Sequence, residues 1–240
     1  MIGGRRFRYS PAVYNRRAAE RVVPWLIERY APQTVIDVGC GTGSWAAVFL
    51  ENGCAVIGMD REDVPDGLLE IPRERFRVVD FEQQLEPEAH FDLALCLEVA
   101  EHLTAPGGER LVRYLTRVAD VVLFSAAVPG QGGQHHLTER WPCYWQDRFS
   151  ANQYVCEDEI RWVYWDDDQI EWWYRQNMFV ARPGTGPSRA LPAVIHPALF
   201  EAARNDIYQG RIGLRAGVMV FVRSLAAAVR RGARRSRAQA

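Results

Sequence analysis

A glycine cluster between a short apolar run and a helical segment constrains this chain more than any other feature. The run Thr34-Val35-Ile36-Asp37-Val38 leads directly into Gly39-Cys40-Gly41-Thr42-Gly43, and a helical pattern follows over 44–51. Glycines at such a turn let the backbone bend sharply, approach a ligand closely and present helix N–H groups to it. The sequence therefore predicts a ligand-binding turn between the first strand and the following helix.

Strand and helix patterns alternate through the first half of the chain, which predicts βαβ units and a parallel sheet. After Pro129 the pattern changes to a glycine-rich loop, a helix over 138–151 and a pair of strands within 154–181 that is interrupted by an acidic turn at 166–168. We therefore expect a doubly wound α/β fold with a mostly parallel sheet and an N-terminal helix. The expected helices span 11–30, 44–51 and 108–119, and the expected strands span 34–38, 55–59, 76–79, 91–97 and 121–127.

Prolines and glycines between 182 and 187 predict a linker, which divides the chain into a main domain over 1–182 and a helical extension over 183–240. No acidic residue follows Asp206, whereas eight arginines do. A basic helical tail can contact an anionic membrane surface or nucleic acid. We favour a solvated tail without such a partner, because the main domain lacks the basic stripe interleaved with aromatic residues that an RNA-modifying enzyme needs.

Composition limits the classes of protein further. In a chain of 240 residues, a hydrophobic content of 48% is enough to form a substantial core. The five cysteines are widely spaced and form no CxxC pair, which argues against a disulfide framework or a zinc site. The first residues lack the apolar core of a signal peptide, and no segment has the length of a membrane span, so we expect a cytoplasmic protein.

Acidic residues at the ends of the first three strands distinguish between two classes of cofactor. Taken alone, the glycine loop also fits a dinucleotide pattern and a nicotinamide-dependent oxidoreductase. Asp37 would repel a pyrophosphate, but it suits a cofactor that carries an ammonium and a sulfonium group. Asp60 can accept hydrogen bonds from ribose hydroxyls. Asp80 and Phe81 offer an acceptor and an apolar face to an adenine ring.

Taken in order, the glycine loop, Asp60, Asp80 and the strand over 91–98 resemble the motifs of class I S-adenosylmethionine-dependent methyltransferases over roughly residues 10–182. The resemblance implies a seven-stranded sheet with an antiparallel last strand. It also implies that Asp37 and the glycines hold the methionine end of the cofactor, Asp60 the ribose, and Asp80 and Phe81 the adenine. The cofactor-binding residues that we expect are Asp37, Gly39, Cys40, Gly41, Gly43, Asp60, Arg61, Asp80, Phe81 and Leu97.

Two further segments supply candidate catalytic groups. The fourth strand is followed by Glu98-Val99-Ala100-Glu101-His102, whose two acids and histidine share one face if the segment is helical. The fifth strand is followed by the glycine-rich loop that leads to His135 and His136. We expect His136, His102, Glu101 and His135 to form the catalytic group, with His136 as the leading general base because imidazole titrates near neutrality.

The same residues form a candidate metal site. Carboxylates and imidazoles that converge from adjacent loops can hold Mg²⁺ or Mn²⁺. The pattern resembles the ExxEH site with a downstream histidine of plant-type small-RNA 2′-O-methyltransferases and ubiquinone-pathway O-methyltransferases. That resemblance implies Glu98, Glu101, His102 and His136 as ligands. The motif also occurs in methyltransferases without a metal, so both interpretations stay open.

The predicted reaction is O-methylation of a small hydroxylated metabolite, such as a sugar or a natural-product intermediate. N-methylation of a small amine, RNA 2′-O-methylation assisted by the basic tail, and cofactor binding without catalysis are the alternatives. Trp141 and Trp145 are expected to line the acceptor pocket, and Tyr9 and Tyr14 to close over the cofactor. The sequence does not indicate an oligomeric state.

Overall fold

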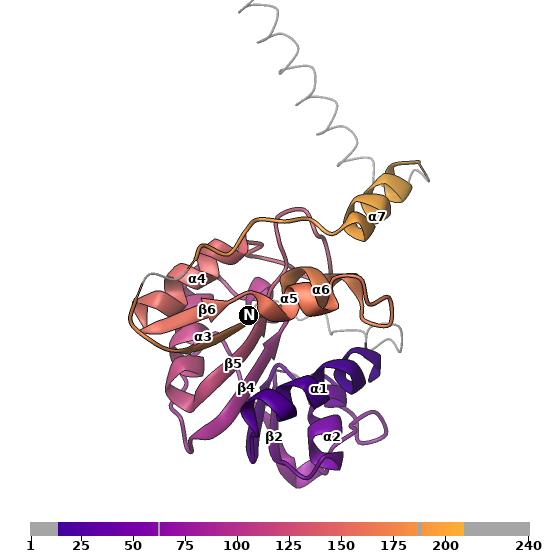
Figure 1. The fold of residues 1–240 in the computed structure, drawn as a ribbon. Coiled ribbons are helices and arrows are strands. Elements are labelled where there is room, and N and C mark those ends of the chain that lie inside the picture. Colours follow the sequence, from indigo (N-terminus) through magenta and orange to yellow (C-terminus); the bar gives the residue numbers. More distant parts are fainter. Residues whose placement is uncertain (1–13, 62, 187–188, 209–240) are drawn as a thin grey trace, which may run out of the picture. The chain divides into compact units, whose positions relative to one another are not determined.

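The computed structural model describes residues 14–61, 63–186 and 189–208. Within these ranges, one seven-stranded sheet carries helices on both faces (Figure 1). β7 is antiparallel to both of its neighbours, and the other described pairings are parallel. This confirms the doubly wound, mostly parallel sheet. The strands follow the order β3 (Phe76–Val78), β2 (Ala55–Asp60), β1 (Thr34–Val38), β4 (Phe91–Leu97), β5 (Ala119–Ser125), β7 (Phe179–Pro183), β6 (Tyr154–Glu157).

The helices connect the strands largely as the sequence pattern predicts. α3 begins earlier than expected because the Thr104 hydroxyl accepts a hydrogen bond from the N–H of Gly107 and caps the helix. α4 begins later than expected, at Pro142, a residue type that favours the first helical turn. The helices of the main unit are α1 (Arg17–Tyr30), α2 (Ser44–Glu51), α3 (Ala105–Val118), α4 (Pro142–Ala151), α5 (Glu159–Tyr164) and α6 (Trp172–Asn177), with two short 3₁₀ helices, η1 (Arg73–Arg75) and η2 (Ala100–His102).

The segment between β6 and β7 differs from the prediction of two strands joined by an acidic turn. It contains the two short helices α5 and α6. Ile160 and Tyr164 lie one helical turn apart and are both buried on the side of the sheet that α1 covers. The Tyr164 hydroxyl donates a hydrogen bond to the carbonyl of Arg21 in α1. Tertiary packing therefore overrides the strand preference of this aromatic-rich segment.

The core has two layers because successive strand residues point to opposite faces of the sheet. Val35 and Leu93 pack in the layer that contains the buried residues of α1 and α2. Ile36 and Ala94 pack in the layer that contains those of α3 and α4. Both faces of the central strands are thus buried, and the carboxyl ends of the strands form one edge of the sheet.

The chain divides into two compact units, residues 1–196 and 197–240, whereas the sequence analysis placed the boundary at 182. The second unit begins with α7 (Pro197–Tyr208). The arginine-rich segment from residue 211 onward lies outside the described residues. None of the helices that the structure describes is long and apolar enough to cross a membrane.

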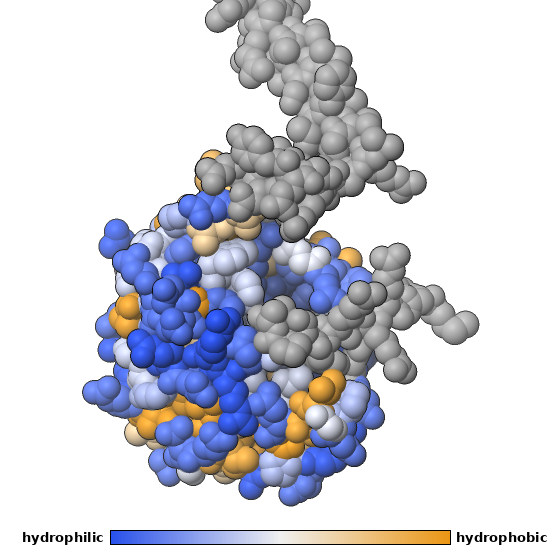
Figure 2. All heavy atoms as spheres, turned by 90° about the vertical axis from the view of Figure 1, so that its right-hand side faces the viewer, coloured by the Kyte–Doolittle hydropathy of each residue, from blue (hydrophilic) through white to orange (hydrophobic). Residues whose placement is uncertain are grey.

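Hydrophilic side chains cover most of the coloured surface in Figure 2, and hydrophobic side chains gather in patches toward its lower part. The exposed large hydrophobic side chains include Leu68, Val78 and Trp162. Apolar residues scattered over the surface are usual in globular proteins. The carboxyl edge of the sheet, where strand ends bring polar groups together, is the better place for a functional site.

The substitution Phe124→Ala should strongly destabilise the protein. The ring of Phe124, on β5, lies 5.4 Å from Trp145, 5.4 Å from Phe149 and 5.3 Å from Phe179, measured between ring centroids. Truncation leaves a cavity among these rings, so we expect the free energy of unfolding to fall by about 3–5 kcal/mol. Denaturant titration followed by circular dichroism measures this change. The control Leu68→Ala, at an exposed site, should change the free energy of unfolding by less than about 0.5 kcal/mol. Equal losses in both variants would contradict the central place of Phe124 in the core.

Candidate active site

The turn after β1 requires glycine for its backbone and for its space. Gly39, Gly41 and Gly43 have φ angles of 83°, 55° and 81°, in the left-handed region that favours glycine. A Cβ atom on Gly39 would lie 2.2 Å from a methyl group of Val99, and one on Gly41 would lie 2.4 Å from the ring of Tyr14. The turn therefore packs closely on both sides, and Tyr14 covers it.

Asp60, at the end of β2, holds the glycine turn in place. Its Oδ2 atom accepts a hydrogen bond from the N–H of Gly41 at 2.7 Å. Because β2 pairs in parallel with β1, the carboxylate reaches the turn from the neighbouring strand end. Asp60 thus lies where an acid that binds ribose is expected, and it also organises the turn.

The other residues expected around the ribose and adenine have varied surroundings. Asp80 is exposed and accepts a hydrogen bond from the N–H of Glu82 at 3.0 Å, as a turn-capping acid does. Phe81 is buried in the core layer of α3 and α4. Arg61 is exposed. Their roles in cofactor binding stay predictions.

Asp37 is a buried acid that forms no salt bridge with any of the residues that the structure describes. Its exposed fraction is 3%, and its Oδ2 atom has no hydrogen-bond partner among the described residues. Burial, together with the nearby charge of Asp60, raises the pKa of Asp37 to about 7. A cationic group of a ligand at this position would compensate the buried charge.

A cleft of about 330 Å³ begins at this acid and runs along the carboxyl edge of the sheet. The prediction that Trp145 lines the acceptor pocket was wrong. That side chain is 1% exposed and packs on Phe124 in the core, because its position on α4 points it at the sheet. Tyr9 lies outside the described residues. The side chains and backbone that line the cleft belong to Tyr14, Asp37, Gly39, Cys40, Ser44, Trp45, Leu97, Glu98, Glu101, His102, Gln131, Gly132, Gly133, Gln134, His136, Trp172, Trp173 and Tyr174.

Two loops meet at the other end of the cleft. The carbonyl of Glu101, in η2, accepts hydrogen bonds from the N–H groups of Leu137 at 2.7 Å and Thr138 at 2.9 Å. These bonds join the loop after β5 to the turn after β4. As a result, Glu101, His102 and His136 each offer a ligand atom, and these atoms all lie within 4.8 Å of one another.

His135 is placed differently from its neighbour. It is exposed, and its φ angle of 60° gives it a left-handed backbone. The group of ligand atoms and the cleft lining contain His136 and omit His135. The loop therefore directs His136, and not His135, toward Glu101 and His102.

Burial controls the charges of this group. Glu101 is fully buried, and its carboxylate oxygens have no hydrogen-bond partner of normal geometry among the described residues. Burial and the neighbouring Glu98 raise the pKa of Glu101 well above its ordinary range. Burial and the neighbouring His136 lower the pKa of His102 to about 4. Without a bound cation, burial therefore favours the protonated form of Glu101, and His102 is neutral at neutral pH.

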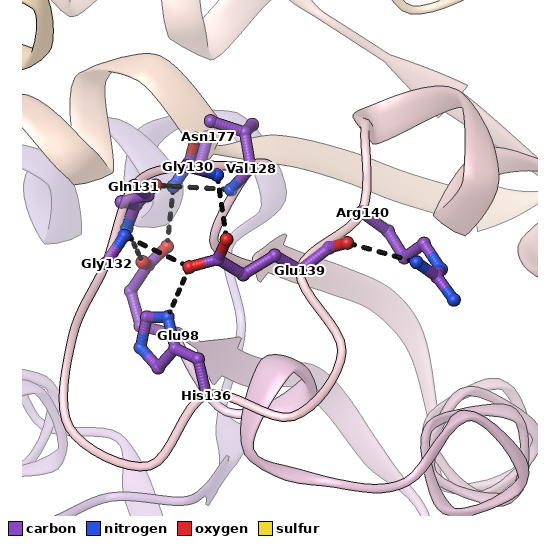
Figure 3. A network of polar contacts seen from close by, with 9 residues as sticks. All are labelled: Glu98, Val128, Gly130, Gln131, Gly132, His136, Glu139, Arg140 and Asn177. Atoms are coloured by element: carbon purple, nitrogen blue, oxygen red, sulfur yellow. Dashed lines mark hydrogen bonds and ion pairs between the residues drawn. The ribbon is translucent and has the colours of Figure 1, made fainter. Parts of the chain in front are cut away.

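Glu98 lies beside this group and is held by two amides that the sequence analysis did not identify. Gln131 Nε2 donates to Glu98 Oε2 at 2.7 Å, and Asn177 Nδ2 donates to Glu98 Oε1 at 3.0 Å (Figure 3). Burial raises the pKa of Glu98, and the hydrogen bonds from Asn177, Ser125 and Gln131 oppose that shift. The two carboxylate oxygens thus face amides from a loop and from α6.

Glu139 is a further site residue that the sequence analysis missed. Its carboxylate lies inside the loop that carries His136 and contacts the Nδ1 atom of that ring (Figure 3). Burial alone would raise its pKa, but hydrogen bonds from Gly130, His136 and Gly132 lower the pKa of Glu139 below its ordinary value. No motif spacing marks this residue, because its role depends on how the loop folds back on itself.

Sheet, glycine turn and cleft define a class I S-adenosylmethionine-dependent methyltransferase fold. The chain belongs to the methyltransferase domain family, whose model matches residues 12–179. Two solved structures share the fold. The sugar N-methyltransferase KedS8 from Streptoalloteichus sp ATCC 53650 superposes with a TM-score of 0.56 at 15% identity, covering 77% of this chain and 99% of that one. The magnesium protoporphyrin IX methyltransferase ChlM from Synechocystis PCC 6803, with bound SAH, has a TM-score of 0.54 at 17% identity, covering 76% and 90%.

Among curated relatives, a ubiquinone biosynthesis O-methyltransferase from Pseudomonas paraeruginosa is 30% identical over 125 residues. The match covers 43% of this chain and 54% of that protein. The chain thus spans about half the length of the curated relatives that it matches.

The substitution Asp37→Asn should stabilise the ligand-free protein more at pH 8 than at pH 5. An unfolded aspartate loses its proton near its ordinary pKa of 3.8, whereas the folded protein holds that proton up to a pKa of about 7. Between these values the folded state binds more protons, so the stability of the wild type falls as the pH rises. Asparagine does not titrate, so the variant does not lose this stability as the pH rises. Denaturant titrations at both pH values measure the difference.

Asp92→Asn is the matched control, because the pKa of Asp92 is shifted in the opposite direction to that of Asp37. Hydrogen bonds from Thr34 and Gln33 lower the pKa of Asp92. Both pH values lie above its folded and unfolded pKa, so this substitution should destabilise the protein by the same amount at each. If the effect of Asp37→Asn does not grow between pH 5 and pH 8, Asp37 is not a buried acid with a raised pKa.

Proposed function

We propose that this chain transfers the methyl group of S-adenosylmethionine to a hydroxyl group of a small metabolite. The observation that carries the proposal is the single cleft that joins Asp37 and the glycine turn to Glu101, His102 and His136. Methyl transfer from a sulfonium needs an acceptor held in line with the methyl carbon and a group that takes the acceptor's proton. In this proposal the end of the cleft at Asp37 binds the methyl donor, and the end at His136 holds the acceptor and takes its proton.

Each end of the cleft has a stated role in this proposal. Asp37 would hold the ammonium group of the cofactor, and Asp60 would hold its ribose hydroxyls. Asp80 and Phe81 would face the adenine. As the acceptor oxygen bonds to the methyl carbon, the carbon–sulfur bond breaks and its electron pair stays on sulfur, giving S-adenosylhomocysteine. When no metal ion occupies its free ring nitrogen, His136 takes the hydroxyl proton.

We further propose that Glu101, His102 and His136 hold a divalent cation such as Mn²⁺ or Mg²⁺. The carboxyl oxygens of Glu101 have no hydrogen-bond partner of normal geometry among the described residues, and burial keeps His102 neutral, so both side chains are suited to a positive ion. The carboxyl group of Glu98 lies beside them. When bound, such an ion lowers the pKa of an acceptor hydroxyl and orients its oxygen.

The relatives support a small acceptor, and we propose oxygen as the nucleophile. The curated relatives include ubiquinone biosynthesis O-methyltransferases. The structures of similar fold include the sugar N-methyltransferase KedS8 and CalS10, an amino pentose methyltransferase from Micromonospora echinaspora. A neutral amine needs less help from a base than a hydroxyl does, so the effect of removing His136 distinguishes O-methylation from N-methylation.

Calorimetric titration should show saturable binding of S-adenosylhomocysteine and none of NADH. A labelled-methyl screen of hydroxylated acceptors should then detect transfer. In that assay His136→Ala should lower kcat by about 10²- to 10⁴-fold, because it removes the proton acceptor. Affinity for S-adenosylhomocysteine should stay unchanged.

His90→Ala is the control for that substitution, because His90 is exposed and pairs with the exposed Asp120, away from the cleft lining. It should leave kcat unchanged. Binding of NADH in place of S-adenosylhomocysteine would overturn the proposed cofactor. Equal losses of affinity and turnover in His136→Ala would mean that His136 has a structural role.

Titration of Mn²⁺ into the purified chain without cofactor should reveal one saturable site. Glu101→Gln should abolish it, because the amide cannot supply the negative charge that the ion needs. The surface control Glu86→Gln, which removes an exposed partner of Arg117, should bind Mn²⁺ as the wild type does. If the wild type binds no Mn²⁺, the metal proposal is wrong and His136 acts without an ion.

A further inference from the structure

The carboxylate of Glu139 closes the loop that carries His136. Its Oε2 atom accepts a hydrogen bond from the N–H of Gly130 at 2.7 Å, and its Oε1 atom accepts one from the N–H of Gly132 at 3.0 Å. Oε1 also lies 3.0 Å from the Nδ1 atom of His136 (Figure 3). One side chain thus ties together two backbone positions and the imidazole of the same loop.

The imidazole of His136 is confined from other directions as well. A Cβ atom on Gly133 would lie 2.3 Å from its Nε2 atom, so the ring occupies the space that any other residue at 133 would need. The ring of His102 meets it edge to face, with centroids 4.9 Å apart. The side chain of His136 is only 12% exposed. Its orientation is therefore determined by three neighbours, of which Glu139 is the one that makes a hydrogen bond.

This hydrogen bond determines which ring nitrogen carries the proton. An ionised carboxylate can only accept hydrogen bonds, so the Nδ1 atom of His136 must be the donor. In a neutral imidazole the Nε2 atom then holds the lone pair. Since Nδ1 is occupied by Glu139, Nε2 is the ring nitrogen that remains for a ligand in the cleft that His136 lines.

We propose that Glu139 is a positioning residue that holds His136 in its Nδ1–H tautomer and presents the Nε2 lone pair to the reacting end of the cleft. The inference rests on the proposed function, because both a proton acceptor and a metal ligand need that lone pair. In the proton-transfer role, the acceptor's proton bonds to Nε2. The carboxylate of Glu139 then stabilises the resulting imidazolium.

Glu139→Gln separates this role from a purely structural one. The glutamine side chain has nearly the same shape, and its carbonyl oxygen can still accept a backbone N–H group of the loop. Its NH₂ group, however, can donate to Nδ1 and so permit the opposite tautomer, in which Nε2 carries the proton. A residue that only holds the loop together would leave the tautomer of His136 unaffected by this exchange.

The test is nitrogen NMR of histidine-labelled protein in the absence of cofactor and acceptor. The chain contains five histidines, and the spectrum of His136→Ala assigns the signals of His136 by their loss. We expect His136 of the wild type to be in the Nδ1–H form, and its Nε2 to become partly protonated in Glu139→Gln. The control Asp120→Asn alters another histidine–carboxylate pair, His90 and Asp120 at 3.6 Å, and should leave the His136 signals unchanged.

Activity provides the second readout. Glu139→Gln should lower kcat by about 10- to 100-fold, the usual effect of removing a carboxylate that orients a functional histidine, with affinity for S-adenosylhomocysteine unchanged. A wild-type spectrum without the Nδ1–H form would overturn the inference even if the variant fails to fold. An unchanged tautomer or an unchanged kcat in the folded variant would also overturn it. Because the tautomer is read without substrates, failure of the proposed reaction would not be mistaken for failure of this assignment.

Discussion

The parallel pairing of β1 with β2 on one side and β4 on the other is the constraint on which the site depends. In this register Asp37 lies opposite Gly58 and Leu95, so the ends of the three strands reach the same edge of the sheet. Three segments that are far apart in the sequence therefore meet at this edge: the glycine turn, Asp60 and the turn that carries Glu98 and Glu101. Each hydrophobic side chain of these strands packs in one of the two core layers, and a shift of one residue would move it into the other layer, where it would not fit the close packing.

The site gathers three acids that have no salt-bridge partner among the described residues. Burial raises the pKa values of Asp37, Glu98 and Glu101, which means that the charged form of each acid is disfavoured in the ligand-free protein. Burial of an unpaired charge costs several kcal/mol, so this arrangement reduces folding stability. It becomes favourable when positive groups enter the cleft, and the cofactor's ammonium and sulfonium are groups of that kind. Perturbed acids at one cleft are characteristic of functional sites.

Short-range pattern was enough to predict most of the fold. The glycine turn, the alternating strands and helices and the acids at the strand ends are local signals, and the ranges of β1, α2 and β4 match the expected ones. The helices α5 and α6 were missed because their aromatic residues favour strands in isolation, whereas tertiary contacts, such as that of Tyr164 with α1, stabilise helices here. Trp145 was assigned to the cleft by its nearness in sequence to the histidine loop, whereas the helical period of α4 directs it into the core.

The sequence by itself determined the class of fold, the glycine turn with its neighbouring acids and the residue types available for chemistry, because these depend on backbone conformation and on periodicity over a few residues. Only the tertiary structure decided which of two adjacent histidines faces the cleft and which residues support it. His136 is selected by the bonds of Leu137 and Thr138 to the carbonyl of Glu101, and Glu98 is held by amides from two distant segments. Such contacts arise from the folding back of loops, and a loop's path depends on hydrogen bonds between residues that no spacing rule connects.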